Sequence, residues 1–433
     1  MSDLVELTVE TIGAGGDGVA HDGGGPVYIP FTVPGDRVRA RIEDERGAGR
    51  AAVVAEMLVP GPGRATPACR HFGICGGCAL QHLDPTLYAA TKTAFVRAAL
   101  AHHGLADAPL RPLILLPPGT RRRVRLSLAR PARKDAMPKV GFSQRATHDL
   151  VAIAECAVLA PTLFALVAPL RVVAGELLAP GESGHATLQL TDSGVDALLD
   201  LPRAPDLAAL ESLAAFAEAQ DLARLLWRVP QAGKSRGEPM LVAQRRPVRV
   251  VIGGTAIDLP PDAFLQATPE AEAGLTAAVR EAVGPATRIA DLFAGIGTFA
   301  FALAGQARVD AVEGWAPAAD AITQAARRAG IAGHVTAQAR DLQRRPLDAD
   351  ELAPYGAVVL DPPRIGAKAQ AAALARARVP RIAAVSCNPA SFARDARILI
   401  AGGYRLAAIQ PIDQFVWSPH VELVAAFVRA DHA

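Results

Sequence analysis

The sequence predicts an α/β fold, and three observations support that prediction. From about Asp258 onward, apolar strand-like runs alternate with helical stretches, which is typical of a parallel sheet covered by helices on both faces. One run ends in a glycine turn, Asp291-Leu-Phe-Ala-Gly-Ile-Gly-Thr-Phe299, and another, Arg381 to Val385, ends beside Cys387. In an open α/β sheet, both ends would face the crevice in which such folds bind ligands.

Length and composition indicate a globular protein of two or three domains. A chain of 433 residues exceeds one ordinary core, and 51% apolar against 20% charged residues argues against disorder. The longest apolar stretches, such as Ala157 to Val173, are broken by proline or charge. The first residues carry neither a basic region nor an apolar signal core, so the expected location is the cytoplasm. A monomer is the default expectation.

Residues 1–58 are expected to form a small β-barrel. Leu4 to Ile12 and Val38 to Glu43 alternate between apolar and polar residues, and Val33-Pro34-Gly35-Asp36 is typical of a tight turn. Small five-stranded barrels often bind oligonucleotides, although such a barrel can also be purely structural.

Residues 59–257 are expected to form a central, mainly antiparallel β domain, followed by the α/β domain in residues 258–433. The central domain opens with the linker Pro60 to Gly63 and a cysteine-containing loop. Its predicted helices are Tyr88 to His102, Pro161 to Leu178 and Asp206 to Gln220. In the α/β domain the predicted strands are Arg288 to Phe293, Val309 to Glu313, Val358 to Leu360, Arg381 to Ser386, Leu406 to Pro411 and Leu423 to Val428, and the predicted helices are Glu270 to Val283, Thr298 to Leu303, Ala316 to Ala329 and Ser391 to Ala401.

Positive charge is concentrated in one segment, although the net charge of the chain is only +2. Between Arg111 and Lys139 there are nine Lys or Arg residues and one acid, Asp135, a local balance of +8. The segment Arg121-Arg-Arg-Val-Arg-Leu-Ser-Leu is strand-like, and such a surface suits contact with nucleic-acid phosphates. A solvated charged edge is the alternative. The nine are Arg111, Arg121, Arg122, Arg123, Arg125, Arg130, Arg133, Lys134 and Lys139.

The five cysteines fall into a group of four and one that stands apart. Cys69, Cys75 and Cys78 lie in a loop rich in glycine and proline, Cys156 follows later, and Cys387 is far away. An odd number of cysteines in a chain expected in the cytoplasm argues against a disulfide framework. The pattern fits four metal ligands and one reactive thiol.

The glycine turn predicts a cofactor site. Gly295-x-Gly297-x-x-Ala300 after a strand is a weak signal by itself, but Glu313 ends the next strand, where a carboxylate accepts hydrogen bonds from ribose hydroxyls. With Asp291 before the turn, this favours an S-adenosylmethionine site over a nicotinamide site. Asp341 is placed to reach the adenine, with a turn cap as the alternative reading.

Three further residues are candidates for chemistry. Asp361 begins an Asp-Pro-Pro-Arg loop at the end of a strand, where the prolines would hold its carboxylate toward the crevice. Cys387 precedes a helix N-terminus, which is expected to lower the pKa of its thiol, although a lone cysteine is more often a buried apolar residue. Glu422 begins an otherwise apolar strand. A role as a general base would explain a carboxylate at this position, and a surface strand end is the alternative explanation.

Together these motifs resemble the bacterial RNA uracil-C5 methyltransferases, in particular the iron–sulfur branch that makes 5-methyluridine in 23S ribosomal RNA. The resemblance runs nearly from end to end. It covers a TRAM-like N-terminal barrel, the cysteines 69, 75, 78 and 156, Phe264-Leu-Gln266, the turn after Asp291, Asp361-Pro-Pro-Arg, Ser386-Cys-Asn-Pro389 and His420-Val-Glu422.

The resemblance implies a class I, Rossmann-like methyltransferase domain and a role for each site residue. The cysteines 69, 75, 78 and 156 would hold a [4Fe–4S] cluster, although four cysteines could equally hold zinc. Thr298 and Thr268 stand where the family often has Asn, so contacts from these two side chains are in doubt. The helix after the cysteine loop, about residues 85–105, would pack on the catalytic domain. The residues expected to line the S-adenosylmethionine pocket are Gln266, Phe293, Glu313, Asp341 and Asp361.

The implied reaction is covalent. The Cys387 thiolate would add to C6 of the uracil, C5 would take the methyl group, and Glu422 would remove the C5 proton. The target base must leave its stack, so a loop or a flipped nucleotide is expected.

Three rival functions remain open at this point. An amino-group RNA methyltransferase also uses Asp-Pro-Pro loops but needs no nucleophilic cysteine. A non-catalytic iron–sulfur RNA-binding or redox-sensing scaffold would bind RNA without methyl transfer. A cytosine-C5 methyltransferase usually enlists a second active-site cysteine, which this chain lacks.

Overall fold

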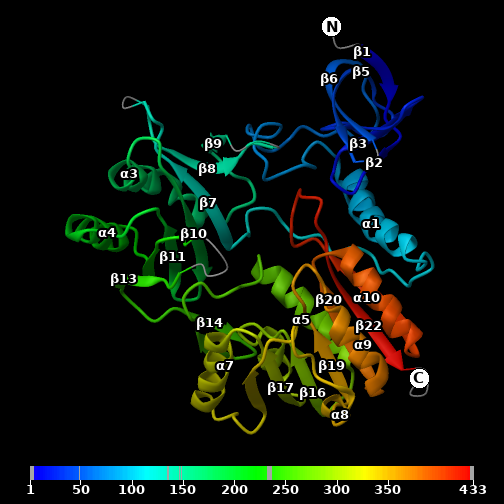
Figure 1. Ribbon diagram of the computed structural model, residues 1–433, viewed down its shortest axis with the longest axis vertical. Helices are drawn as coiled ribbons and strands as arrows, with labels where there is room; N and C mark the ends of the chain where they lie inside the picture. Colours follow the sequence, from blue (N-terminus) through cyan, green and yellow to red (C-terminus); the bar gives the residue numbers. More distant parts are fainter. Residues whose placement is uncertain are drawn as a thin grey trace.

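In the residues that it describes, the computed structural model contains three large sheets and a two-stranded hairpin, arranged one after another along the chain (Figure 1). No helix in the described part of the chain is long and apolar enough to cross a membrane. The described residues are 4–47, 49–133, 136–145, 147, 149–231 and 237–429.

The N-terminal sheet has the strand order β1-β5-β6-β4-β3-β2 and encloses a small apolar core. Side chains of a strand point alternately to opposite faces, so Val38 and Ala40 are buried while Arg41 is exposed. The strands are β1 (Leu4–Thr8), β2 (Thr11–Ile12), β3 (Gly18–Asp22), β4 (Gly25–Ile29), β5 (Arg37–Arg46) and β6 (Gly49–Val59).

The central sheet, in the order β13-β12-β11-β10-β7-β8-β9, is antiparallel except where β11 and β12 run parallel. The predicted helix from Pro161 to Leu178 is two helices, because Pro169 has no N–H to bond to Ala165 and a new helix starts at Val167. The strands are β7 (Arg123–Ala129), β8 (Lys139–Ser143), β9 (Leu150–Ala152), β10 (Ser183–Thr191), β11 (Gly194–Asp200), β12 (Arg224–Arg228) and β13 (Met240–Gln244), the helices are α2 (Pro161–Phe164), α3 (Val167–Leu177) and α4 (Leu207–Ala219), and the hairpin β14 (Arg249–Ile252) and β15 (Thr255–Asp258) follows.

The sequence pattern predicts an all-parallel C-terminal sheet, but the sheet in the structure is mixed. Its strand order is β18-β17-β16-β19-β20-β22-β21, and β22 runs antiparallel to both of its neighbours. Only a loop without a helix joins β21 to β22, and antiparallel strands need no crossover helix. The strands are β16 (Arg288–Leu292), β17 (Arg308–Glu313), β18 (Val335–Ala339), β19 (Ala357–Leu360), β20 (Arg381–Ser386), β21 (Tyr404–Ile412) and β22 (Glu422–Arg429).

Helices cover both faces of this sheet, as the alternating pattern predicts (Figure 1). Successive residues of one strand serve opposite cores, so Ile289 packs toward α5, α6 and α7 while Ala290 packs toward α8, α9 and α10. Helix α1, far earlier in the chain, joins the second group by packing on α10. The helices are α1 (Pro85–His102), α5 (Pro269–Val283), α6 (Thr298–Leu303), α7 (Ala316–Arg328), α8 (Ala349–Leu352), α9 (Lys368–Ala377) and α10 (Pro389–Ala401).

A buried lysine connects α1 to the loop between β21 and β22. The Lys92 ammonium is 0% exposed and lies 2.6 Å from the Asp413 carboxylate. It also donates to the backbone carbonyls of Phe415, at 3.1 Å, and His420, at 2.6 Å. One cation therefore holds the first, third and last residues of the segment 413–420, which we call the β21–β22 loop.

Breaking this ion pair should destabilise the protein strongly. Lys92→Met leaves the buried Asp413 carboxylate uncompensated, and we expect the free energy of unfolding to fall by about 3–5 kcal/mol. Urea denaturation followed by tryptophan fluorescence measures the change. Lys139→Met, at an exposed position of β8, is the matched control and should change stability by less than about 0.5 kcal/mol. Equal losses of unfolding free energy in the two variants would contradict a stabilising role for the buried Lys92–Asp413 ion pair.

Candidate active site

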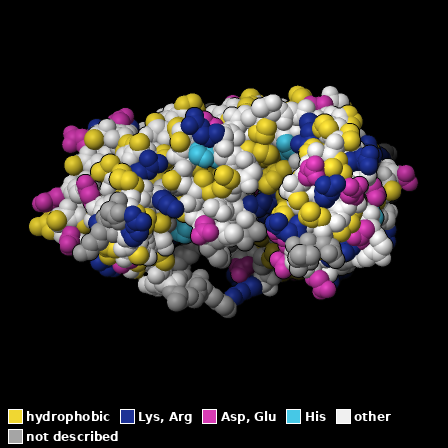
Figure 2. All heavy atoms as spheres, turned by 90° about the horizontal axis from the view of Figure 1, so that it is seen from above, with side chains coloured by type: hydrophobic (Ala, Val, Ile, Leu, Met, Phe, Trp, Pro, Cys, Tyr) yellow, Lys and Arg dark blue, Asp and Glu magenta, His cyan; other side chains and the backbone are white. Residues whose placement is uncertain are grey.

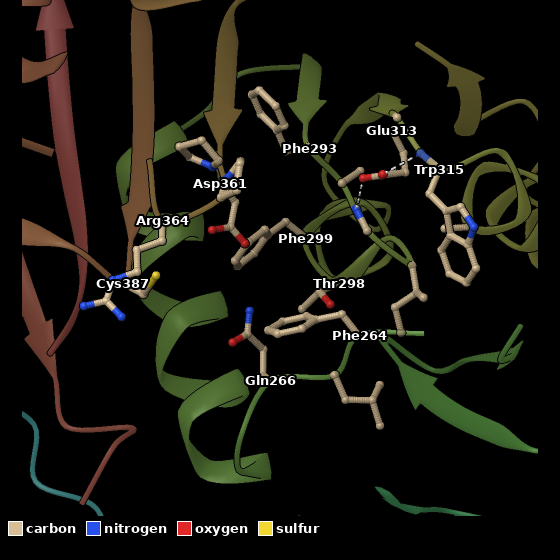
Figure 3. Close-up of a pocket in the computed structure, with 18 of the residues that line it drawn as sticks. Phe264, Gln266, Phe293, Thr298, Phe299, Glu313, Trp315, Asp361, Arg364 and Cys387 are labelled. Carbon is tan, nitrogen blue, oxygen red and sulfur yellow. Dashed lines mark hydrogen bonds between the residues drawn. The ribbon is translucent and has the colours of Figure 1, made fainter. Parts of the chain in front are cut away.

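A cavity of about 590 Å³ opens along the carboxyl edge of the C-terminal sheet (Figure 3). Strands β16, β17, β19 and β20 end at this edge, and the segment before α5 forms the opposite wall. All seven residues predicted for cofactor binding and catalysis line this cavity, namely Gln266, Phe293, Glu313, Asp341, Asp361, Cys387 and Glu422.

The glycine turn after β16 is held by an acid from the next strand. The backbone N–H of Gly295 donates to the Glu313 carboxylate at 2.9 Å, and the N–H of Trp315 donates to its other oxygen at 2.8 Å. Gly297 has a φ of 89°, and a Cβ there would meet the Phe301 ring at 2.9 Å, so glycine is required. Phe293, at the start of the turn, also has a positive φ, 62°, which is a strained conformation for phenylalanine and is often found at ligand sites.

Of three further residues considered for ligand contact, Asp341 and Thr298 line the cavity and Thr268 does not. Asp341 caps its own turn by accepting from the N–H of Gln343 at 3.0 Å, and it also lines the cavity. Thr298 lies at the start of α6 and lines the cavity. Thr268 does not line it, because its hydroxyl caps α5 by accepting from the N–H of Ala271 at 3.0 Å. Thr268 is therefore a structural cap.

Two loops bring Asp361 and Cys387 together. The carbonyl of Arg364, in the Asp-Pro-Pro-Arg loop, accepts hydrogen bonds from the Asn388 amide and the Ser391 hydroxyl, each at 3.0 Å. Asn388 in turn caps α10 with its side-chain oxygen. The loop after β19 and the loop after β20 are thus joined, with both side chains facing the cavity (Figure 3).

The antiparallel course of β22 places Glu422 beside Cys387. Ser386 pairs with Leu423 in the ladder between β20 and β22, so the next positions along it are Cys387 and Glu422. Glu422 is 4% exposed, and its Oε2 accepts a hydrogen bond from the Gln414 amide at 2.8 Å. A thiol and a buried carboxylate therefore share one end of the cavity.

The pKa of Cys387 contradicts the sequence-based expectation. Burial, together with the Glu422 and Asp361 carboxylates, raises the pKa of the Cys387 thiol to about 11, although Arg364 lowers it. Desolvation and two like charges outweigh the helix N-terminus that was expected to lower it. In the ligand-free protein the thiol is therefore protonated at neutral pH.

The carboxylates of the site are also shifted toward their neutral forms. Burial raises the pKa of Asp361 to about 7 and, with Asp361 nearby, that of Glu422 to about 8. Asp291 lies buried beneath the glycine turn, where burial, Asp361 and Glu313 raise its pKa to about 8. So many acids around one cavity favour a cationic ligand, because its charge would restore their ionised forms. S-adenosylmethionine, a sulfonium, fits this requirement.

Comparisons with known proteins identify the family, although no protein-family model matches the chain. An RNA methyltransferase of Caulobacter vibrioides, itself uncharacterised, is 42% identical over 98% of this chain and 100% of its own length. This chain belongs to the RNA methyltransferase family.

Two further proteins that are similar to this RNA methyltransferase, one in sequence and one in fold, carry more specific names. The 23S rRNA (uracil(1939)-C(5))-methyltransferase RlmD of Chromohalobacter salexigens is 34% identical over 98% of this chain and 89% of its own length. The crystal structure of the tRNA (uracil-54, C5)-methyltransferase of Pyrococcus abyssi with S-adenosyl-L-homocysteine matches 98% of this chain and 100% of that one, with a TM-score of 0.74 and 22% identity. The latter likeness shows a shared fold.

The four early cysteines of the methyltransferase share a second cavity, of about 580 Å³. Cys69, Cys75, Cys78 and Cys156 all line it as free thiols, and burial with the three other thiols nearby raises the pKa of Cys78 to about 12. Among the described residues, no three His, Cys, Asp or Glu side chains form a group suited to one metal ion.

The basic run does not form one exposed strip. Arg122 is buried and pairs with Glu272, and Arg130 donates to the carbonyls of Gly175 and Leu178 at the end of α3. Lys134 and Asp135 lie outside the described residues. Figure 2 shows Lys and Arg side chains dispersed among acidic and apolar ones over the face seen from above. Only part of the run reaches the catalytic cavity.

Several residues that line the catalytic cavity were not predicted as site residues, among them three arginines and Gln414. Arg121 lines both cavities, and the Arg123 guanidinium stacks on the ring of Phe264 at 4.6 Å. Arg364 is the third arginine. The charge of the arginines was a signal that could have identified them, whereas a single glutamine in a loop gives no such signal.

Proposed function

We propose that this RNA methyltransferase transfers the methyl group of S-adenosylmethionine to C5 of a uridine, with 23S ribosomal RNA as its substrate. The observation that carries the proposal is the single cavity that holds a thiol, Cys387, and a buried carboxylate, Glu422, beside a glycine turn. The name of the Chromohalobacter salexigens relative supports the choice of base and of RNA.

The reaction needs a nucleophile because C5 of uracil is a poor one until something adds at C6. Cys387 loses its proton to solvent and the thiolate adds to C6, so that the C5–C6 double bond opens and the electron pair is held as an enolate across C5 and O4. C5 then accepts the methyl group, whose bond to the sulfonium sulfur breaks. Glu422 removes the C5 proton, the double bond reforms, and the C6–sulfur bond breaks to release the thiolate.

The residues of the glycine turn would hold the methyl donor. Glu313 is at the side of Trp315, where the ribose and adenine would bind, and Asp361 lies between that side and Cys387 (Figure 3). Asp341 lines the same cavity and would contact the adenine. Phe293 and Gln266 face the same space (Figure 3). When bound, S-adenosylmethionine supplies the methyl group and a positive charge that favours the ionised forms of Asp361 and Glu422.

The four early cysteines would hold a [4Fe–4S] cluster. They are free thiols that line one cavity, and a cluster distributes its thiolates over four iron atoms, so it does not require the geometry of one ion. Methyl transfer involves no electron transfer, so the cluster would serve folding or RNA placement. We also propose the boundaries 1–58 for a TRAM-like RNA-binding barrel, 59–257 for the central domain and 258–433 for the catalytic domain.

Trapping on fluorinated RNA tests the proposed function. Wild-type protein is incubated with S-adenosylmethionine and 23S ribosomal RNA transcribed with 5-fluorouridine, and denaturing electrophoresis follows. Because fluorine cannot leave C5 as a proton does, we expect a slow-migrating protein–RNA adduct that requires the methyl donor. Fluorinated transfer RNA, run in parallel, tests the choice of RNA.

Each rival function predicts a different result. Methylation of ordinary RNA without any adduct on fluorinated RNA would establish an amino-group methyltransferase. RNA binding without methyl transfer would establish a scaffold. An adduct on transfer RNA alone would keep the chemistry and replace the substrate.

A further inference from the structure

The side chain of Gln414 connects the two walls of the catalytic cavity. Its Nε2 donates to Glu422 Oε2 at 2.8 Å and to Gln266 Oε1 at 3.1 Å. Its Oε1 accepts from the backbone N–H of Ala267 at 2.9 Å. Gln414 is 3% exposed, so these contacts lie away from bulk water.

This set of partners permits only one orientation of the Gln414 amide. A backbone N–H can only donate, so the amide oxygen must face Ala267. The two amide hydrogens then point to Glu422 and Gln266. A rotated amide would place its oxygen against the Glu422 carboxylate and its NH₂ group against the N–H of Ala267.

The backbone around Gln414 is held as firmly as its side chain. Asp413 accepts from Lys92, and the carbonyl of Phe415 accepts from the same ammonium. The N–H of Asp413 donates to the carbonyl of Ile114 at 2.9 Å. On the opposite wall, Arg122 donates to the carbonyls of Gln266, at 3.1 Å, and Ala267, at 2.9 Å. Both ends of the hydrogen-bond chain are therefore fixed to the fold.

We propose that Gln414 is the positioning residue of the general base: its amide holds the Glu422 carboxylate in place and favours its ionised form, so that Oε1 can take the C5 proton. This inference rests on the proposed function. Gln414 does not touch the reacting atoms in this scheme. The titratable groups that face Glu422 are Asp361 and Cys387. Burial and the Asp361 carboxylate disfavour the charged form of Glu422, and the Gln414 hydrogen bond opposes them by favouring the charged carboxylate.

The role assigned to Gln414 affects one step only. Addition of Cys387 and methyl transfer need no base at C5, whereas proton removal and release of the thiolate do. Loss of the amide should therefore slow turnover on ordinary RNA and leave trapping on 5-fluorouridine RNA unchanged, because trapping ends before proton removal. Removing a hydrogen bond to a charged group typically costs about 10- to 100-fold in such a step.

The test compares Gln414→Met with wild type on 23S ribosomal RNA. Methionine has a similar length but offers no hydrogen bond to Glu422. We expect turnover to fall about 10- to 100-fold, the rate of adduct formation on 5-fluorouridine RNA to stay within about twofold, and a covalent adduct to accumulate on ordinary RNA. Gln410→Leu is the matched control, because Gln410 lies on β21 outside the lining of the catalytic cavity and its side-chain amide donates to the carbonyls of Pro112 and Pro411. It should behave as wild type.

If the melting temperature of Gln414→Met is far below that of wild type, Gln414→Glu serves as a second variant. It keeps an oxygen for Ala267 and replaces the NH₂ group with an oxygen that repels Glu422. We again expect slower turnover on ordinary RNA and an unchanged rate of adduct formation on 5-fluorouridine RNA. Equal slowing of trapping and turnover, or unchanged turnover, would overturn the positioning role while leaving the proposed function intact. Absence of any fluorinated adduct in wild type would overturn both.

Discussion

Cys387→Ala is expected to lower methyl transfer to uridine by about 10⁴-fold or more and to abolish the adduct on 5-fluorouridine RNA. Without the thiol, nothing adds at C6, and C5 does not become nucleophilic. The cost is therefore that of removing a covalent intermediate, which other groups in the cavity do not replace. Incorporation of label from S-adenosylmethionine into RNA, together with gel analysis of the adduct, measures both effects.

Controls separate loss of chemistry from loss of structure. Binding of S-adenosylmethionine to Cys387→Ala, measured by calorimetry, should remain within about threefold of wild type, because the thiol is replaced without a new charge. Cys387→Ser keeps the shape of the side chain but is a much weaker nucleophile, and it should also form no adduct. Retention of methyl transfer by Cys387→Ala, with the methyl group on an exocyclic nitrogen, would replace the C5 mechanism by the amino-group one.

Glu422→Gln is expected to stop the reaction after methyl transfer. The gel should therefore show a protein–RNA adduct for this variant, whereas Cys387→Ala shows none. Loss of a general base typically costs about 10²- to 10⁴-fold. Cys387 can still add and methyl transfer can still follow, but the C5 proton stays in place. The covalent adduct should therefore accumulate on ordinary RNA, where wild type shows little.

The pH dependence of proton removal distinguishes Glu422 from other bases. Burial raises the pKa of Glu422 to about 8, so the carboxylate is largely protonated below that pH and ionised above it. The measurement starts from the covalent adduct that has already accepted the methyl group, so that ionisation of Cys387 does not contribute. Release of tritium from C5 of this adduct should increase with pH through about 8 and level off above it. Glu422→Gln should show a slow release that does not follow this curve. A wild-type curve that is flat between pH 6 and 9 would contradict Glu422 as the base.

Much of the site could be predicted from sequence because its signals are local. The glycine turn, the Asp-Pro-Pro-Arg loop and Cys387 each follow an apolar run directly, and strand ends in an α/β sheet meet at one edge. The predicted strand from Arg381 to Ser386 is β20, with the same bounds. The roles of these residues stay proposals until the variants above are measured.

Glu422 shows where local pattern is insufficient. It begins its strand, and in the all-parallel sheet that was predicted it would lie at the edge opposite to Cys387. Only the reversal of β22 brings the start of that strand to the carboxyl edge. The sign of the Cys387 pKa shift likewise depends on burial and on two carboxylates that are distant in sequence.

The sequence by itself determined the alternating α/β pattern, the glycine turn and the candidate site residues, because strand period, turn geometry and side-chain type act over a few neighbours. The tertiary structure alone decided the direction of β22, the protonation of the thiol, and the contacts of Gln414 with Gln266, Ala267 and Glu422. These depend on which segments, 148 residues apart in the case of Gln414 and Gln266, come within hydrogen-bond distance. Desolvation and hydrogen bonding act through space, and a linear pattern does not record them.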